Sequence, residues 1–399
     1  MNCIERGTKD FNKALIALFL GSFVTFADLY STQPVIPIIA EQYGLSLATA
    51  SLSLSFSTGT MAIGLILVSF FTQNLNRKIV MGVSLSLSAL LCLLIGFVDS
   101  MPVLLLLRAI QGAALAGYPA IAMAYITEEF NPKSLGYVMG IYLSGNSLGG
   151  LSGRLIVGTL SDVVSWTSAI AILGAISCII SLFFWKLIPN STRAIGFKKD
   201  SRLDTMKAFK GSLMQKDLML LYVLGFLLMG AFVSVYNFIG IPLMQPPYSL
   251  SQIVVSLLFI VYLVGTFSSA WMGKLADERQ RKNVLLAGVV VMLLGALLTL
   301  GTSLWLKTIG LIIFTFCFFG SHSVASSWVG ILARKKEKGT ASSLYLFSYY
   351  TGSSILGALG GVFFHRNGWL GEILMVTLLL LISIGCTLAL SKFKQPSSL

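Results

Sequence analysis

Three ionisable side chains lie inside stretches of sequence that are otherwise apolar: Asp28, Arg108 and Arg154. A charge at the centre of a membrane helix costs about 2.5–3.5 kcal/mol on insertion scales, so each should face a cavity or a partner. A carboxyl group close to guanidinium groups can exchange a proton when its surroundings change. The three residues therefore suggest proton coupling, with Asp28 as the one acid suitably placed. The alternative is a fixed ion pair that only satisfies buried charges.

Other polar side chains in the apolar runs could contact a substrate. His322 can titrate in the physiological range, although a lone histidine between Ser321 and Ser323 is more often a packing residue. Gln111 follows Arg108 by one helical turn. Amide and tyrosine side chains could line a cavity or could only pack between helices, and both alternatives stay open. This group comprises Tyr142, Asn146, Asn237, Tyr345, Tyr349 and Tyr350.

The elements that must position these residues are membrane helices. Hydrophobic residues make up 56% of the chain and charged residues 11%, which excludes an ordinary soluble domain. A spanning helix needs roughly 20 mostly apolar residues, and the runs are continuous, unlike the alternating strands of a β-barrel. We predict a retained first helix and twelve transmembrane helices in all, at 13–39, 48–71, 79–98, 102–127, 134–160, 164–188, 217–240, 250–276, 283–303, 305–329, 337–363 and 369–391.

The distribution of basic residues orients these helices. With both termini cytoplasmic, all but four of the 28 Lys and Arg residues fall on the cytoplasmic side. The net charge of +13 is therefore explained by membrane topology, and we expect no binding to nucleic acid. The polar segment 189–216 divides the helices six and six. We therefore predict an N-terminal bundle at 1–188, a cytoplasmic basic linker at 189–216 and a C-terminal bundle at 217–399.

An internal repeat relates the two halves. LGSFVTFADLY (20–30) aligns without gaps with MGAFVSVYNFI (229–239), and Arg77 and Lys78 recur as Arg281 and Lys282. The predicted helices 134–160 and 337–363 are both rich in glycine, which lets helix backbones approach closely in lipid. Asp28 corresponds to Asn237 in the repeat. The sequence thus predicts two pseudo-symmetric six-helix bundles with the buried charge confined to the first.

The repeated loop residues resemble a known family. Arg77 and Lys78, with Asp277, Arg281 and Lys282, resemble the Gly-x-Leu-x-Asp-x-x-Gly-Arg-Lys loop signature of the major facilitator superfamily. LLRAIQGAALAG (106–117) is similar to the helix 4 pattern of its drug:proton antiporters, and 34–37 (PVIP) to their helix 1 pattern. The resemblance implies the major facilitator fold, a cytoplasmic gating role for the loop residues and a role in proton coupling for Arg108.

We expect a secondary transporter in the cytoplasmic membrane of a bacterium, most simply a monomer. It would export a small organic or amphipathic substrate by alternating access, with the proton gradient as energy source and no cofactor or metal. Uptake or facilitated diffusion of a sugar, organic acid or amino acid is the second possibility. An intramembrane enzyme or receptor is a remote one, because we find no paired catalytic acids, metal-ligand cluster or phosphate-binding loop.

Overall fold

The structure is a computed structural model, and it describes residues 3–71, 75–131, 134–190, 209–334 and 338–391. These residues are almost entirely helical, and no β-strand occurs among them. The chain divides into two compact units, one formed by 1–199 with 243–260 and the other by 200–242 with 261–399. Most of the predicted linker 189–216 lies outside the described residues, and the predicted bundle limits stay a prediction.

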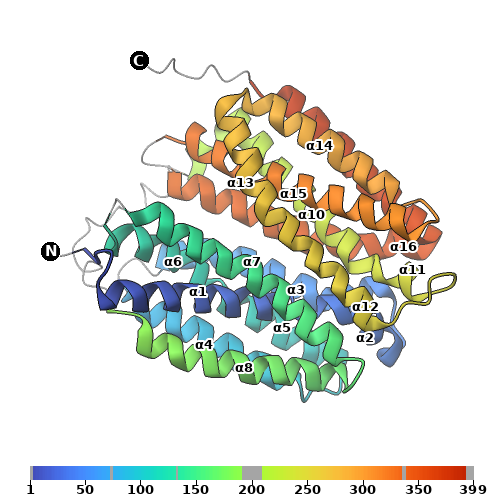
Figure 1. Cartoon of the computed structure of the whole chain (residues 1–399), viewed down its shortest axis with the longest axis horizontal. Coiled ribbons are helices and arrows are strands. Elements are labelled where there is room, and N and C mark those ends of the chain that lie inside the picture. Colours follow the sequence, from blue (N-terminus) through green and yellow to red (C-terminus); the bar gives the residue numbers. More distant parts are fainter. Residues whose placement is uncertain (1–2, 72–74, 132–133, 191–208, 335–337, 392–399) are drawn as a thin grey trace. The chain divides into compact units, whose positions relative to one another are not determined.

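The first unit is built mainly from the N-terminal helices (Figure 1). In chain order these elements are α1 (Lys9–Leu29), η1 (Gln33–Val35), α2 (Ile36–Tyr43), α3 (Leu47–Phe71), α4 (Arg77–Ile95), α5 (Met101–Leu115), α6 (Gly117–Glu129), α7 (Leu135–Leu160) and α8 (Trp166–Leu187). The short helices α12 (Gln252–Leu257) and η3 (Leu258–Val261) begin in the segment 243–260, which belongs to the same unit.

The second unit contains α10 (Lys216–Phe238), α13 (Tyr262–Glu278), α14 (Arg281–Leu298), α15 (Leu304–Leu332) and α16 (Lys338–Ala389). The short helix α11 (Gly240–Met244) follows α10. The 52-residue α16 is two helices joined at a kink, because Asn367 and Gly368 have non-helical backbone angles. Gly368 has φ of 56°, which glycine adopts without the Cβ strain of other residues.

All twelve predicted apolar runs fall on helices. Ten helices among the described residues are long and apolar enough to cross a membrane, and α16 counts once among them although it holds two runs. The remaining run is α7, a helix of 26 residues. Its glycines, serines and Arg154 lower its mean hydropathy. This helix is therefore long enough to cross a membrane but less apolar than the ten others.

The first span is not a continuous helix. α1 ends at Leu29, and the chain passes through a turn and the short η1 before α2 begins at Ile36. Pro34 and Pro37 lie in the first turns of η1 and α2. Proline has no backbone N–H and cannot continue the hydrogen bonds of a preceding helix. The break places free backbone carbonyl groups in the middle of an apolar segment, where they need donors.

Glycines set how closely the helices pack in each unit. A Cβ atom added at Gly145, Gly149 or Gly153 of α7 would overlap a backbone carbonyl of α1. In the second unit, a Cβ at Gly352 of α16 would overlap the carbonyl of Phe226 on α10. The packing role predicted for the glycine-rich helices is therefore present in both units. A sliding role during transport remains a prediction.

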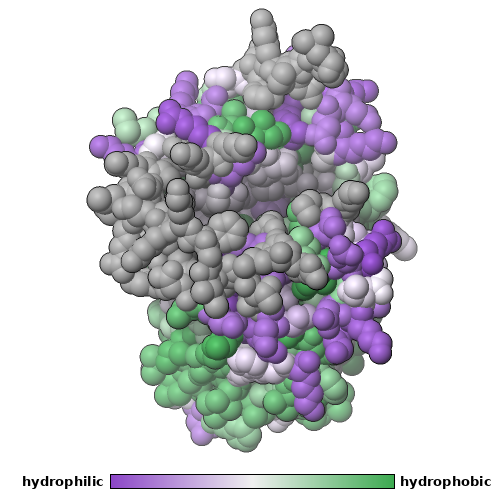
Figure 2. Space-filling view, turned by 90° about the vertical axis from the view of Figure 1, so that its left-hand side faces the viewer, coloured by the Kyte–Doolittle hydropathy of each residue, from purple (hydrophilic) through white to green (hydrophobic). Residues whose placement is uncertain are grey.

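The outer surface of the helices is apolar. Hydrophilic residues gather on the end of the molecule seen in Figure 2, whereas hydrophobic residues cover its lower flank, where Figure 1 shows α4 and α8. Large exposed apolar residues on these two helices include Leu90, Leu94, Ile179 and Leu182. An apolar surface of this extent is expected where lipid replaces water as the solvent.

The α1–α7 contact can be tested with alanine in place of glycine. We expect Gly149→Ala to lower the stability of the protein by about 1–3 kcal/mol, because the added methyl group must displace the α1 backbone at Phe23. Gly140→Ala on the same helix is the matched control, because nothing lies within 4 Å of its Cβ position. Thermal unfolding of the detergent-purified variants measures both. Equal midpoints would contradict tight packing at Gly149.

Candidate functional site

Arg108 on α5 fills the gap left by the break in the first span. Its side chain is fully buried, and Nη1 donates a hydrogen bond to the Asp28 carbonyl oxygen at 2.9 Å. Nη2 donates to the Leu29 carbonyl oxygen, and Nε to that of Ser53 on α3 at 2.8 Å. A guanidinium group has five donors in a fixed plane, which suits several carbonyl acceptors at once. Arg108 therefore caps the end of α1.

Asp28 is also fully buried, but its carboxylate points to other partners. Ser177 on α8 donates a hydrogen bond to Oδ1 at 2.7 Å, and Ser88 on α4 donates to Oδ2 at 3.0 Å. Arg108 contacts the backbone of Asp28 and forms no salt bridge with its carboxylate. The structure therefore shows no direct ion pair between Asp28 and an arginine, because the Arg108 guanidinium donates to backbone carbonyl groups.

Gln111 connects the arginine to the same group. Its Oε1 accepts a hydrogen bond from Arg108 Nη1 at 2.6 Å, and its Nε2 donates to the Ser88 carbonyl oxygen at 3.2 Å. The helical spacing of Arg108 and Gln111 puts both side chains on the buried face of α5. The structure thus brings together three of the predicted residues, Asp28, Arg108 and Gln111, in one hydrogen-bonded cluster.

Arg154 on α7 supports the break from another side. Its Nε donates to Gln33 Oε1 at 2.6 Å, and its Nη1 donates to the Gly150 carbonyl oxygen at 2.5 Å. Its guanidinium carbon lies 4.0 Å from the centre of the Tyr30 ring, within the range of a cation–π interaction. Both buried arginines therefore hold the chain between α1 and α2, although their contacts with that segment differ.

The predicted aromatic and histidine residues form a second cluster, in the second unit. His322 Nδ1 and the Tyr345 hydroxyl form a hydrogen bond at 2.9 Å. The Tyr349 ring centre lies 4.5 Å from the His322 ring and 5.2 Å from the Tyr350 ring. Phe318 stacks on His322 at 6.2 Å. The four predicted residues, His322 on α15 and Tyr345, Tyr349 and Tyr350 on α16, are therefore neighbours.

The other predicted residues have separate surroundings. Tyr142 stacks against Tyr118 with ring centres 6.4 Å apart, inside the core of the first unit. Asn146 lies one turn further along α7, and its buried Oδ1 has no hydrogen-bond partner among the described residues. Asn237 donates from Nδ2 to the Gly357 carbonyl oxygen at 3.1 Å, which ties α10 to α16.

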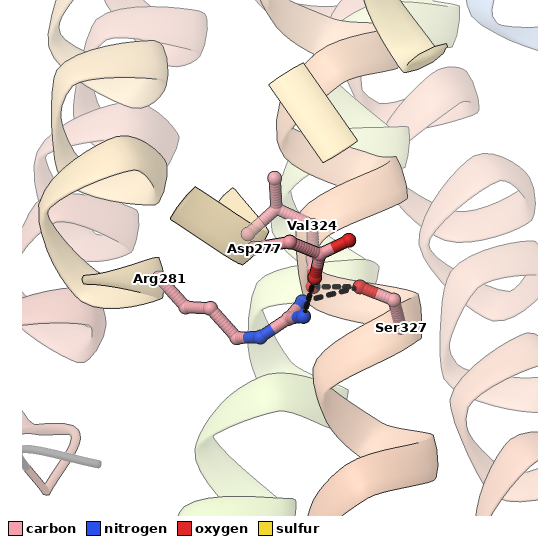
Figure 3. A network of polar contacts seen from close by, with 4 residues as sticks. All are labelled: Asp277, Arg281, Val324 and Ser327. Carbon is pink, nitrogen blue, oxygen red and sulfur yellow. Dashed lines mark hydrogen bonds and ion pairs between the residues drawn. The ribbon is translucent and has the colours of Figure 1, made fainter. Parts of the chain in front are cut away.

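The loop motif makes different contacts in the two halves. Arg77 Nη2 forms an ion pair with Glu128 at 3.1 Å, and both side chains are mostly buried. In the second copy Arg281 pairs with Asp277 on α13 and donates to Ser327 Oγ on α15 at 3.0 Å (Figure 3). The sequence motif did not identify Glu128 or Ser327 as partners. Both follow only from which helix ends lie beside the loop.

The second lysine of the motif also finds acceptors. Lys282 Nζ donates to the carbonyl oxygens of Leu388 and Leu390, each at 2.7 Å. These carbonyl groups are at the end of α16 and have no N–H partner within the helix, so Lys282 satisfies them. A cation at the carboxyl end of a helix also interacts favourably with the helix dipole. This loop residue therefore holds the end of the last helix, in addition to any gating role.

Sequence reasoning missed a fully buried acid inside a predicted span. Glu372 on the second part of α16 is fully buried, and neither of its carboxyl oxygens has a hydrogen-bond partner among the described residues. A buried ionisable side chain is therefore present in the second half as well, whereas the sequence prediction confined such side chains to the first half. Glu372 lies only three residues after the predicted start of its span at 369, where an acid is usually assigned to the membrane surface. Its position between Gly371 and Ile373 was the available signal.

Comparisons of the sequence with known proteins all find the same family. The sequence profile of the Major Facilitator Superfamily matches residues 18–358 and 241–398. The inner membrane transport protein YnfM of Escherichia coli is 44% identical over 96% of this chain and 91% of its own length. The uncharacterized MFS-type transporter YybF of Bacillus subtilis is 41% identical over 96% of this chain and 95% of its own.

More distant proteins share the fold. A bacterial homologue of the human lysosomal transporter Spinster superimposes with a TM-score of 0.80 at 16% identity, covering 97% of this chain and 98% of its own. The nucleoside transporter NupG superimposes with a TM-score of 0.78 at 17% identity, covering 94% and 99%. With the helices described above, these likenesses confirm the predicted all-α membrane fold.

The capping role of Arg108 predicts a large effect of a conservative change. We expect Arg108→Lys to lower the stability of the protein by at least about 2 kcal/mol, because a single ammonium group cannot reach the carbonyl groups of Asp28, Leu29 and Ser53 together. The exposed Arg279→Lys is the control. Thermal unfolding compares them, and an unchanged midpoint for the Arg108 variant would refute the cap.

The Arg77–Glu128 ion pair predicts rescue by charge exchange. Arg77→Glu and Glu128→Arg should each destabilise the protein, and the double variant should recover about 1 kcal/mol relative to the sum of the single changes. A double-mutant cycle on thermal stability measures this coupling. Strict additivity would mean that the two side chains do not interact in solution.

Proposed function

The chain belongs to the Major Facilitator Superfamily, and we propose that it is a proton-coupled transporter that exports a small organic or amphipathic substrate. It is a multi-pass membrane protein and a transporter, not an enzyme. Proton coupling, the direction of transport and the kind of substrate are the proposed parts. Transport would proceed by alternating access, in which the substrate site opens in turn to each side of the membrane.

The observation that carries the proposal is the environment of the Asp28 carboxyl group. It is fully buried, and its direct partners are the hydroxyl groups of Ser88 and Ser177. A hydroxyl group can donate to a carboxylate or accept from a carboxylic acid, so this site can hold either protonation state. A salt bridge would have fixed the charged state instead. The hydroxyl pair thus supports reversible proton binding at Asp28.

The position of Asp28 supports a link between the proton and helix movement. Asp28 lies in the last turn of α1, immediately before the break, and its own carbonyl oxygen accepts a hydrogen bond from Arg108. A change in how α1 ends would therefore move the carboxyl group relative to Ser88, Ser177 and the arginine together. Coupling in a transporter requires such a dependence, because the proton affinity must differ between the two conformations.

The aromatic cluster of the second unit is the proposed contribution to substrate binding. His322 and Tyr349 are partly exposed, and rings with polar edges suit a planar or amphipathic molecule. A Helicobacter pylori relative, 22% identical over 89% of this chain and 90% of its own, is described as a probable sugar efflux transporter. That description supports export here, and a sugar belongs among the substrates to be tested.

We further propose that the protein is a monomer in the bacterial cytoplasmic membrane with both termini cytoplasmic, and that the proton gradient is its only energy source. The support for this orientation is the excess of basic residues at the cytoplasmic side of the predicted topology. No resident cofactor is needed for this mechanism.

The proposal can be tested in two stages. A thermal-shift screen of purified protein with sugars, organic acids, amino acids and amphipathic cations identifies a ligand, because a ligand of the folded state raises the unfolding temperature. Inside-out vesicles with an imposed pH gradient, acidic inside, then receive that ligand. Export predicts that the ligand enters the vesicles and that the gradient collapses in proportion. Transport that leaves the gradient unchanged would refute antiport and favour facilitated diffusion.

Asp28→Asn should abolish gradient-driven transport and preserve folding. Asparagine has nearly the shape of the acid and can still hydrogen-bond to the two serines, but it cannot bind or release a proton. Asp99→Asn, in an exposed loop, is the matched control and should transport normally. Vesicle transport with and without the gradient measures the effect, and thermal unfolding checks the fold. Full gradient-dependent flux in Asp28→Asn would remove Asp28 from the mechanism.

A further inference from the structure

Glu372 is a carboxyl group enclosed within the second unit. It is 0% exposed, and it lies one helical turn after the break at Asn367 and Gly368 in α16. Neither carboxyl oxygen has a hydrogen-bond partner among the described residues, and Glu372 takes part in no ion pair with them. A buried polar group without partners is costly and therefore uncommon, so its presence needs a physical account.

The space for this carboxyl group is made by a glycine. A Cβ atom at Gly360, in the first part of α16, would lie 2.7 Å from Glu372 Oε2 and 3.0 Å from the Phe238 ring, and it would overlap the Ser234 hydroxyl. The carboxyl group therefore lies where α10 meets both parts of α16. The Ser234 hydroxyl lies beside the same position, and its oxygen, like the two carboxyl oxygens, has no hydrogen-bond partner among the described residues.

The charged groups of the surrounding helices are directed elsewhere. Lys307 on α15 donates from Nζ to the Thr299 carbonyl oxygen at 2.7 Å, and that oxygen also accepts from Trp369 Nε1 at 3.1 Å. His365 and Arg366, at the end of the first part of α16, are exposed. On α10 the nearby groups are the neutral Ser234 and Asn237. With no counter-charge beside it, the carboxyl group is stable in its neutral, protonated form.

The internal repeat gives this site a counterpart. In the first unit Asp28 on α1 faces a hydroxyl group of α8, the Ser177 side chain. In the second unit the corresponding helices are α10 and the second part of α16. Here the acid, Glu372, is on α16 and the hydroxyl group, that of Ser234, is on α10. Each unit therefore holds one buried acid between its first and last helix, with a serine across from it.

We propose that Glu372 is a second proton-binding site of the transporter. Its carboxyl group is protonated in this structure and exchanges that proton with water when the junction of α10 and the two parts of α16 opens. Only the O–H bond breaks and reforms, and the proton passes to and from water. The use of this site in transport rests on the proposed proton coupling, whereas proton binding at Glu372 does not.

Infrared spectroscopy of the purified protein in lipid tests the site without any substrate. A neutral carboxylic acid has a C=O stretching band separate from those of carboxylates and amides. We expect this band at neutral pH in the wild type, a downshift in D₂O, and a loss of intensity from the band in Glu372→Gln. Glu41→Gln, an exposed acid, is the control and should keep the band. A spectrum of Glu372→Gln identical to that of the wild type would overturn the proposal.

Isotope labelling keeps the test decisive if Glu372→Gln does not fold. Protein made with ¹³C-labelled glutamate shifts the band of every neutral glutamic acid, and Glu372→Asp replaces that band at this site by an unlabelled one. A band that never shifts in D₂O would show a sealed structural acid and would also overturn the proposal. Vesicles in which the wild type moves no protons would refute proton coupling and leave the infrared result for Glu372 independent.

Discussion

The structure depends on one constraint, which is that a break in a helix within an apolar environment must find its hydrogen-bond donors inside the protein. Pro34 and Pro37 follow the early end of the first helix, which leaves the Leu29 carbonyl group without a helical N–H partner and the Asp28 carbonyl group with local hydrogen bonds from Ser31 in place of a regular helical bond. Arg108 supplies the donors. This explains why a charged residue lies inside an otherwise apolar helix, and why its plane of five donors matters more than its charge.

The same constraint separates the roles of the buried charges. Because Arg108 is used by backbone carbonyl groups, the Asp28 carboxylate is left to two hydroxyl groups on α4 and α8. Arg154 is likewise used by Gln33 and the Gly150 carbonyl oxygen. The arginines therefore stabilise the break, and the acid is left with two neutral hydroxyl contacts, which is the arrangement on which the proposed proton binding rests.

The sequence predicted the helices well, because a spanning helix requires a long apolar run and this protein has such runs at every span. The glycines also predicted that α7 and the first part of α16 pack closely against other helices, and Gly149 of α7 indeed meets the α1 backbone and Gly352 of α16 the α10 backbone. The side-chain partners could not be predicted. Which serine faces Asp28 depends on the rotation of α4 and α8 about their axes, and apolar composition leaves that rotation open. Glu372 was missed because it lies close to the start of its predicted span, where a residue is usually exposed. Near a kink, the distance of a residue from the start of its span does not show whether its side chain is buried.

The two units differ less in chemistry than the repeat suggests. Asn237 replaces Asp28 in the alignment, and it binds the Gly357 carbonyl oxygen as a packing residue. An acid is nevertheless present between the equivalent helices, supplied by α16 instead of α10. A side chain on either helix can occupy the same interface, so a residue-by-residue alignment does not show that the two acids occupy equivalent places. The two units share an acid at this interface, but different helices carry it. The asymmetry that remains is in the partners. Asp28 has two hydroxyl donors and a nearby arginine, whereas Glu372 has no hydrogen-bond partner among the described residues. The two units therefore place an acid at equivalent interfaces but surround it differently.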